Sequence, residues 1–407
     1  MTLRPRSRTA SLDLDQLATE VVVRTVEIAQ VPAPTGHEQE RAAVVTHWWR
    51  DAGFAAVSSD DVGNCWAQAR PGTGPAVVLA AHLDTVFGLD TDHVVERVAD
   101  RLVGPSVGDD SVALAALPAL GRLLAATEGS MPVLVLATVG EEGFGNLAGA
   151  HRAVAHPPVE LEALIAIEGN YLGRLGTVGV GSQRWHVEVS GPGGHAWEQA
   201  EAPSAVHVAA GMVHALSMVP TVSRTTSLNV GRLGGGEAIN ARARRAWFDL
   251  ELRGASVAAL AELEAQATAV LEAPVGAEMS VRVTDTGRRP AGRIDPGHPL
   301  VVAARGALEA RAVAWREVAS STDANAAHAV GLPAIALGVT SGAGEHTPQE
   351  WVDIPPIATG LAALADTVVR YEHLKLSRTA RPSAASRSPV AIRSHVAIRS
   401  HVEGENP

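Results

Sequence analysis

The stretch MPVLVLATVGEEG at residues 131–143 joins an uninterrupted apolar run to a pair of acids that lie between two glycines. A short run that is apolar on both alternating faces is typical of a strand buried on both sides. Further runs of this kind occur at 76–81, 161–167 and 334–339, and helix-like segments occur at 13–30, 40–53, 111–126 and 146–155. The pattern predicts an α/β fold in which helices cover both faces of a mixed sheet.

The segment 178–290 has a different pattern. Residues 185–189 alternate between apolar and polar side chains, as in a strand with one exposed face. The order that follows is helix, two strands, helix and strand, which predicts a compact α+β unit of its own. We therefore expect a catalytic domain formed by 1–177 and 291–374, interrupted by an inserted domain at 178–290. Residues 375–407 are rich in Arg, Ser and Pro, repeat Val-Ala-Ile-Arg-Ser-His, and predict a disordered tail.

Composition narrows the class of protein. The chain has 407 residues, is 46% hydrophobic and has a formal net charge of −11, which argues against nucleic acid or an anionic membrane as the main partner. Its one cysteine, Cys65, excludes an internal disulfide, so we expect a reducing, cytoplasmic setting. The N-terminal residues lack the apolar stretch of a signal peptide, and no apolar run is long enough to predict a membrane span.

Acids and histidines follow the predicted strands, where ligands gather in open α/β sheets. The motifs are His82-Leu83-Asp84, Gly108-Asp109-Asp110, Gly140-Glu141-Glu142, Ile167-Glu168 and Gly344-Glu345-His346. Each motif alone has an ordinary structural explanation, such as a strand-end hydrogen bond, a helix cap or a solvated turn. Together they would repel one another without cations. Mixed imidazole and carboxylate ligands predict zinc, with manganese or cobalt as alternatives.

Their order along the chain resembles that of a known family. Residues 15–372 resemble the co-catalytic zinc hydrolases of metallopeptidase clan MH, which include aminoacylase, carboxypeptidase G, peptidase T and succinyl-diaminopimelate desuccinylase. The resemblance implies a zinc-exopeptidase-like catalytic domain that holds two zinc ions per subunit.

The resemblance also implies a role for each motif. His82, Asp109 and Glu168 are expected to hold one metal ion. Asp109, Glu142 and His346 are expected to hold the other, with Asp109 as the bridge. Asp84 is expected to orient His82, and Glu141 to act as general base on the water between the metals.

In the inserted segment the resemblance implies a lid and dimerisation domain, and therefore a homodimer. His195 lies within the motif Gly-Pro-Gly-Gly-His-Ala and matches a histidine of the family that reaches an active site across the dimer. The resemblance implies that His195 stabilises the oxyanion. The alternative is that His195 has a purely structural role. Asn240 and Arg253 resemble substrate-contacting residues of the family. An arginine fork suits a substrate carboxylate, and a surface ion pair is the alternative for Arg253.

Some positions depart from the family pattern. Ser111 stands where a lysine often follows the paired aspartates. Glu168 matches the deacylase branch, whereas Ser321 to Asn325 is closer to peptidase T. We therefore predict metal-dependent hydrolysis of an amide bond in a short peptide. The first alternative is an N-acyl amino acid amidohydrolase. The second is a non-catalytic metal-binding protein, which predicts a missing base or ligand, and none is missing.

Overall fold

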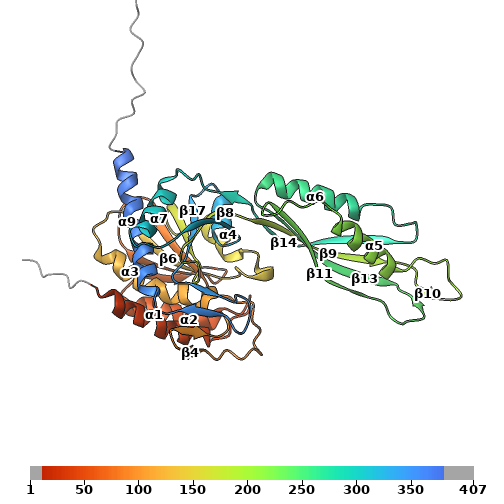
Figure 1. Ribbon diagram of the computed structural model, residues 1–407, viewed down its shortest axis with the longest axis horizontal. Helices are drawn as coiled ribbons and strands as arrows, with labels where there is room; N and C mark the ends of the chain where they lie inside the picture. The colour runs from red at the N-terminus through yellow and green to blue at the C-terminus, as the bar shows by residue number, and fades with distance from the viewer. Residues whose placement is uncertain (1–11, 380–407) are drawn as a thin grey trace, which may run out of the picture.

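The computed structural model describes residues 12–379, and its larger body is built on a nine-stranded mixed sheet (Figure 1). The strand order is β1-β2-β6-β3-β7-β17-β8-β15, with β16 paired to β8. The strands are β1 (Ala55–Ser59), β2 (Cys65–Arg70), β3 (Ala76–His82), β6 (Val133–Thr138), β7 (Leu161–Ile167), β8 (Arg174–Gly179), β15 (Gly292–Arg293), β16 (Arg316–Ser320) and β17 (Ala334–Leu337).

Helices cover both faces of this sheet, as the apolar runs predict. Along β3, Val77 and Leu79 belong to one core, whereas Val78 and Ala80 belong to a second core on the opposite face. The first core includes residues of α1 (Leu14–Ala29), α2 (Gln39–Asp51), α3 (Val112–Ala126), α7 (Pro299–Glu309) and α9 (Ile357–Thr379). The second includes residues of α4 (Ala148–Ala155) and α8 (Ala324–Ala329). The predicted fold class is confirmed.

A small four-stranded sheet brings together two loops that are far apart in the chain. Its order is β18-β19-β5-β4, from β4 (Glu96–Val98), β5 (Arg101–Val103), β18 (Gly342–Ala343) and β19 (Trp351–Asp353). The loop after β5 leads through the short helical turn Val107–Ser111, and the loop between β18 and β19 contains His346. Because β5 pairs with β19, these two loops lie side by side.

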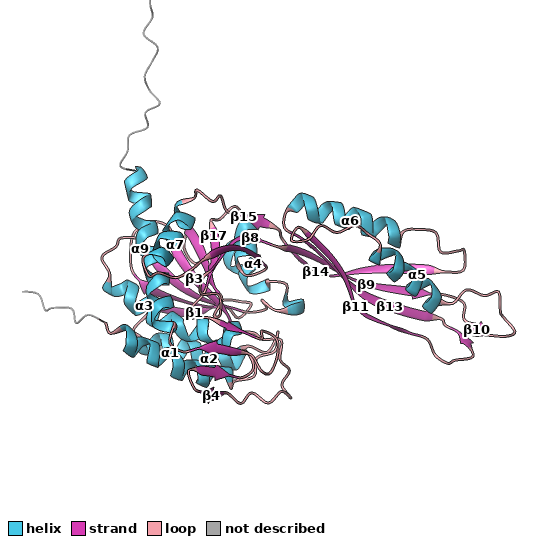
Figure 2. Ribbon diagram, in the orientation of Figure 1, coloured by secondary structure: helices cyan, strands magenta, loops and turns pink. Residues whose placement is uncertain are grey.

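The inserted segment forms a separate, elongated unit (Figure 2). An antiparallel sheet of order β11-β13-β9-β14 comprises β9 (Gly181–Ser190), β11 (Thr226–Gly235), β13 (Arg245–Gly254) and β14 (Ser280–Arg289). Helices α5 (Ala205–Ser217) and α6 (Val257–Leu271) share one apolar core with this sheet. A two-residue ladder, β10 (Gly194–His195) with β12 (Ala241–Arg242), lies at the end farthest from the larger body (Figure 1).

The C-terminal helix passes the expected start of the tail. α9 continues to Thr379, although the tail was expected from 375. Tyr371 is buried, and Lys375 Nζ lies 2.6 Å from Glu162 Oε1. This part of the helix is therefore packed against the larger domain. The repeat at 390–401 lies outside the described residues. Within residues 12–379, no helix combines the length and apolar character that a membrane crossing requires.

Candidate metal centre

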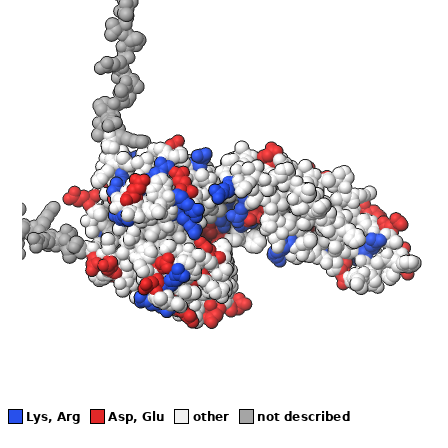
Figure 3. Space-filling model, in the orientation of Figure 1, with Lys and Arg blue, Asp and Glu red and all other residues white. Residues whose placement is uncertain are grey.

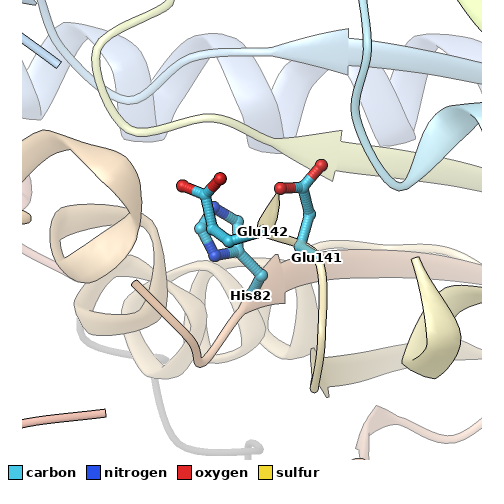
Figure 4. A group of neighbouring side chains, drawn as sticks. All are labelled: His82, Glu141 and Glu142. Atoms are coloured by element: carbon cyan, nitrogen blue, oxygen red, sulfur yellow. The ribbon is translucent and has the colours of Figure 1, made fainter. Parts of the chain in front are cut away.

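Three neighbouring strands deliver acidic and histidine side chains to one edge of the large sheet. β3 is parallel to both β6 and β7, so the carboxyl ends of all three strands lie together. His82 ends β3, Glu141 and Glu142 follow β6, and Glu168 follows β7. Gly140 has a φ of 64°, a left-handed conformation that glycine adopts without strain and that turns the chain after β6. Figure 4 shows His82, Glu141 and Glu142 projecting from these strand ends.

Asp109 lies between the two predicted histidine ligands. Its Oδ1 is 2.8 Å from His82 Nε2, and its Oδ2 is 3.1 Å from His346 Nε2. His346 Nε2 is also 3.2 Å from Glu142 Oε1. Donor atoms of Asp109, Glu142 and His346 all lie within 4.8 Å of one another, close enough to bind one cation. Asp109 thus presents one oxygen toward each histidine, as a bridging carboxylate does.

The other predicted ligand set, His82, Asp109 and Glu168, is only partly grouped in the structure. Donor atoms of His82 and Glu168 lie within 4.8 Å of one another together with a donor atom of Asp110, the neighbour of Asp109. Both oxygens of Asp110 accept backbone hydrogen bonds, from His82 N at 3.1 Å and from Gly169 N at 3.0 Å. Asp110 therefore ties the end of β3 to the chain after β7. The grouping of His82, Asp109 and Glu168 around one ion stays a prediction.

Burial and the close approach of carboxylates and histidines shift the pKa values at this edge of the sheet. Burial raises the pKa of Glu168 and Asp110 well above the usual range. Burial alone would lower the pKa of His82, but its hydrogen bond to Asp109 and the surrounding carboxylates raise it. Hydrogen bonds to Asp109 and Glu142 raise the pKa of His346 to about 10. Buried carboxylates and imidazoles thus lie close together at this edge, and the donor set suits zinc.

Asp84 holds the acidic turn more closely than it holds the histidine. Its Oδ1 and Oδ2 accept hydrogen bonds from the backbone N–H groups of Glu141 and Glu142, each at 2.9 Å, and Thr35 Oγ1 donates to Oδ2 at 2.8 Å. His82 Nδ1 is 2.9 Å from the Asp84 backbone oxygen and 3.7 Å from its carboxylate. In the structure the backbone carbonyl is thus the nearer partner of the imidazole.

Glu141 is buried at the same edge and points toward Arg289, which ends β14 in the inserted sheet. Arg289 Nη1 donates to Glu141 Oε1 at 3.0 Å and to Ser321 Oγ at 3.1 Å. Both side chains of the ion pair are almost completely buried. Burial, only partly offset by Arg289, raises the pKa of Glu141 to about 8. A carboxyl group with this pKa can exchange a proton near neutral pH.

Two further residues at this site, Arg289 and Glu350, belong to none of the predicted motifs. Arg289 contacts Glu141 although the two residues are 148 positions apart in the chain. The only local signal near Arg289 in the sequence is the proline that follows it. Glu350 is fully buried, and its Oε1 accepts hydrogen bonds from the N–H groups of Gly108 and Asp109, both at 2.7 Å. Glu350 therefore holds the Asp109 loop in place, and burial raises its pKa to about 8.

The three residues predicted in the inserted segment have different positions. Arg253 lines the metal-centre cavity, which has a volume of about 550 Å³. The same cavity is lined by Asp109, Glu141, Glu168 and His346. Its Nε donates to Glu251 Oε2 at 2.8 Å. His195 and Asn240 lie at the distant tip instead, where His195 is exposed and the Asn240 backbone oxygen accepts from Ala196 N. Within one chain neither residue lines the cavity.

Comparison with known proteins places these features in a family. The model for peptidase family M20/M25/M40 matches residues 78–370, more than half of the chain. A protein of Aeropyrum pernix that is described as a putative [LysW]-lysine/[LysW]-ornithine hydrolase is 29% identical over 238 residues, which cover 56% of this chain and 61% of that protein. The chain therefore spans less than two thirds of this relative's length.

Solved structures show the same fold. Aminopeptidase PepT from Bacillus cereus has a TM-score of 0.72 at 21% identity, covering 87% of this chain and 98% of that one. A tripeptidase from Staphylococcus aureus has a TM-score of 0.75 at 19% identity, covering 88% and 99%. The predicted resemblance is confirmed in both its sequence and its architecture.

Proposed function

The chain belongs to peptidase family M20/M25/M40, a family of metal-dependent hydrolases, and on this premise we propose that it cleaves an amide bond in a short peptide carrying a free carboxylate. The observation that carries the proposal is the position of Asp109 between His82 and His346, beside Glu142, in a cavity that also contains Glu141. Metal ligands next to a buried carboxylate of raised pKa provide the parts that amide hydrolysis requires.

Two zinc ions are the proposed cofactor. His82, Asp109 and Glu168 would hold one ion, and Asp109, Glu142 and His346 the other. The chemistry that such a pair supplies when bound is a water of lowered pKa and polarisation of the scissile carbonyl. Two nitrogen ligands among several carboxylates are compatible with cobalt or manganese as well.

Glu141 is the proposed general base. It accepts a proton from the attacking water and delivers it to the leaving amine. Arg289 fixes the orientation of the Glu141 carboxylate, since its guanidinium donates to Oε1. Asp84 fixes the backbone beneath it. The proton carrier is therefore held on two sides by the protein.

The free carboxylate of the substrate is assigned to Arg253. This guanidinium lies at the wall of the cavity and is 40% exposed, so it can turn toward a ligand. Planar guanidinium groups bind carboxylates with two parallel hydrogen bonds. An N-acyl amino acid offers the same carboxylate, so a deacylase remains the competing activity.

The proposed assembly is a homodimer through the inserted domain. β11 is an edge strand of the inserted sheet, and unpaired edges can pair with a second copy. His195 and Asn240 lie far from the cavity of their own chain, so the roles assigned to them, oxyanion stabilisation and substrate contact, require the cavity of a partner.

A substrate panel on zinc-reconstituted protein tests the proposal. We expect dipeptides and tripeptides with a free C-terminus to be hydrolysed faster than their C-terminal amides, because amidation removes the charge assigned to Arg253. Faster turnover of N-acetyl or N-succinyl amino acids than of any peptide would replace the peptidase with the deacylase. No hydrolysis of either class by protein that holds two metal ions would refute both activities.

A further inference from the structure

A second cavity adjoins the metal-centre cavity on the side of β16. It has a volume of about 440 Å³, and Arg253 and Ala319 line both cavities. Its other walls come from β16 and from the start of β11 with the loop before it. Arg253 and Ala319 therefore lie where the two cavities adjoin.

The second cavity is lined by arginines. Arg224 and Arg316 join Arg253 in its wall. Its one acidic lining residue, Glu317, is paired with Arg305 and accepts from Thr177 Oγ1. Within residues 12–379, neither Arg224 nor Arg316 has an acidic side chain in ion-pair contact. Basic side chains gather at the junction between the two sheets (Figure 3). The cavity is therefore positively charged and selects for anions.

Both arginines are held on ordered backbone. Arg224 has a φ of 62°, a left-handed conformation that costs free energy for a residue with a side chain. Its loop is closed by hydrogen bonds from Thr225 N at 2.9 Å and Thr226 N at 2.8 Å to the Val222 backbone oxygen. Arg316 starts the edge strand β16, and its N–H donates to Gly173 O at 2.9 Å. Both residues are exposed, so their side chains extend into the solvent-filled cavity from ordered backbone.

The direction of β16 connects the two cavities. Arg316, at the start of the strand, lines the second cavity, whereas Ser320, at its end, lines the metal-centre cavity. A strand of this length spans about 13 Å at about 3.3 Å per residue. A substrate that extends from the metal centre along β16 can therefore reach both cavities, with Arg253 in the wall of each.

We propose that Arg224 and Arg316 form a second anion-binding subsite, so that the preferred substrate carries two carboxylates on the half that extends past Arg253. An acidic residue at the C-terminus of a peptide, or an N-acyl acidic amino acid, has this chemistry. The inference rests on the proposed function, because it specifies the substrate of the same site.

The test compares two substrates that differ by one charge. The best substrate scaffold from the panel is made with a C-terminal glutamate and with a C-terminal glutamine. The enzyme variants are Arg224→Gln, Arg316→Gln and the double variant, and Arg282→Gln is the matched control. Arg282 lies on the inserted sheet with its side chain 79% exposed, and it lines neither cavity.

We expect the wild type to favour the glutamate substrate by about tenfold or more in kcat/KM, since charge-assisted hydrogen bonds are stronger than neutral ones. The double variant is expected to lose most of that preference while its kcat/KM for the glutamine substrate stays within about twofold. The same glutamate-to-glutamine ratio in the wild type and the double variant overturns the subsite while leaving the proposed function intact.

A binding measurement separates the subsite from turnover. By calorimetry on the zinc-loaded protein, we expect glutarate to bind the double variant at least about fivefold more weakly than the wild type or Arg282→Gln. Equal affinity in all three overturns the proposal, even if no amide is cleaved. Phosphate binding that is lost in the double variant, with an unchanged substrate ratio, also overturns it, because the cavity then serves a free anion.

Discussion

The metal-centre cavity and the tip of the inserted sheet hold their side chains in opposite ways. Behind the cavity wall, Asp84 and Asp110 are fully buried, and every carboxylate oxygen of the two accepts a hydrogen bond. At the tip, His195 is exposed, and the nearby Trp197 side chain is 85% exposed. One chain therefore preorganises the cavity, whereas the tip leaves His195 and Trp197 open to solvent.

Among the variants, Glu141→Gln should reduce activity most, and it tests the role of the metal-centre cavity. Glutamine keeps the shape of the side chain but cannot take a proton. We expect kcat to fall by about 10²–10⁴-fold or more, with the metal content unchanged. Elemental analysis and single-turnover kinetics check both parts. Activity near that of the wild type would remove Glu141 from the mechanism, and loss of metal would make it a ligand.

His195→Ala tests whether the exposed tip of the inserted sheet takes part in catalysis. We expect kcat to fall by roughly 10²-fold through loss of oxyanion stabilisation. Because the residue is exposed, the free energy of unfolding should change by less than about 0.5 kcal/mol. If His195 acts across the dimer, mixing this variant with Glu141→Gln should restore about a quarter of wild-type activity, since half of the dimers then contain one intact site.

Mixing that restores nothing would place His195 outside the partner's active site. A monomer by light scattering would have the same consequence. A fall in metal content in His195→Ala would instead make the histidine a ligand or a structural residue.

The smallest expected effect is the pH dependence of stability in chelator-treated protein. The folded-state pKa of Glu141 is raised from 4.5 to about 8 and that of His346 from 6.5 to about 10. In both cases the folded state binds more protons than the unfolded state, so stability falls as pH rises through these ranges. Burial lowers the pKa of His328 from 6.5 to about 4, so this residue makes the folded state more stable as pH rises. That stabilisation no longer changes above about pH 7.5.

We therefore expect Tm of the chelated protein to fall by a few degrees from pH 7.5 to 9, and zinc to reduce that slope because cations replace the bound protons. Differential scanning calorimetry with and without zinc measures this. A Tm that rises with pH over this window would contradict the assigned signs. Zinc binding should also release protons into the buffer.

Much of the fold could be predicted from the sequence because buried parallel strands are continuous apolar runs. The run at 161–167 coincides with β7, and 131–138 contains β6. β2 was not predicted since its sequence CWAQAR includes Arg70, whose burial depends on an ion pair with Glu372 at 2.6 Å. Such a pair joins distant segments, so no local pattern reveals it.

The candidate site shows the same limit. His82, Glu142 and His346 could be predicted because each follows a strand and occurs in the family's order. Arg289 and Glu350 could not, because their positions depend on how the inserted sheet and the β19 loop pack against the cavity. The roles proposed for His195 and Asn240 require a second chain, and the contacts between two chains have no local pattern in one sequence.

Anomalous diffraction at the zinc edge, from crystals grown with zinc, would locate the metal ions relative to Asp109. We expect two peaks per chain on either side of the Asp109 carboxylate. One should also lie within bonding distance of His82 and Glu168, and the other within bonding distance of Glu142 and His346. A single peak, or peaks that do not contact Asp109, would contradict the two-metal centre.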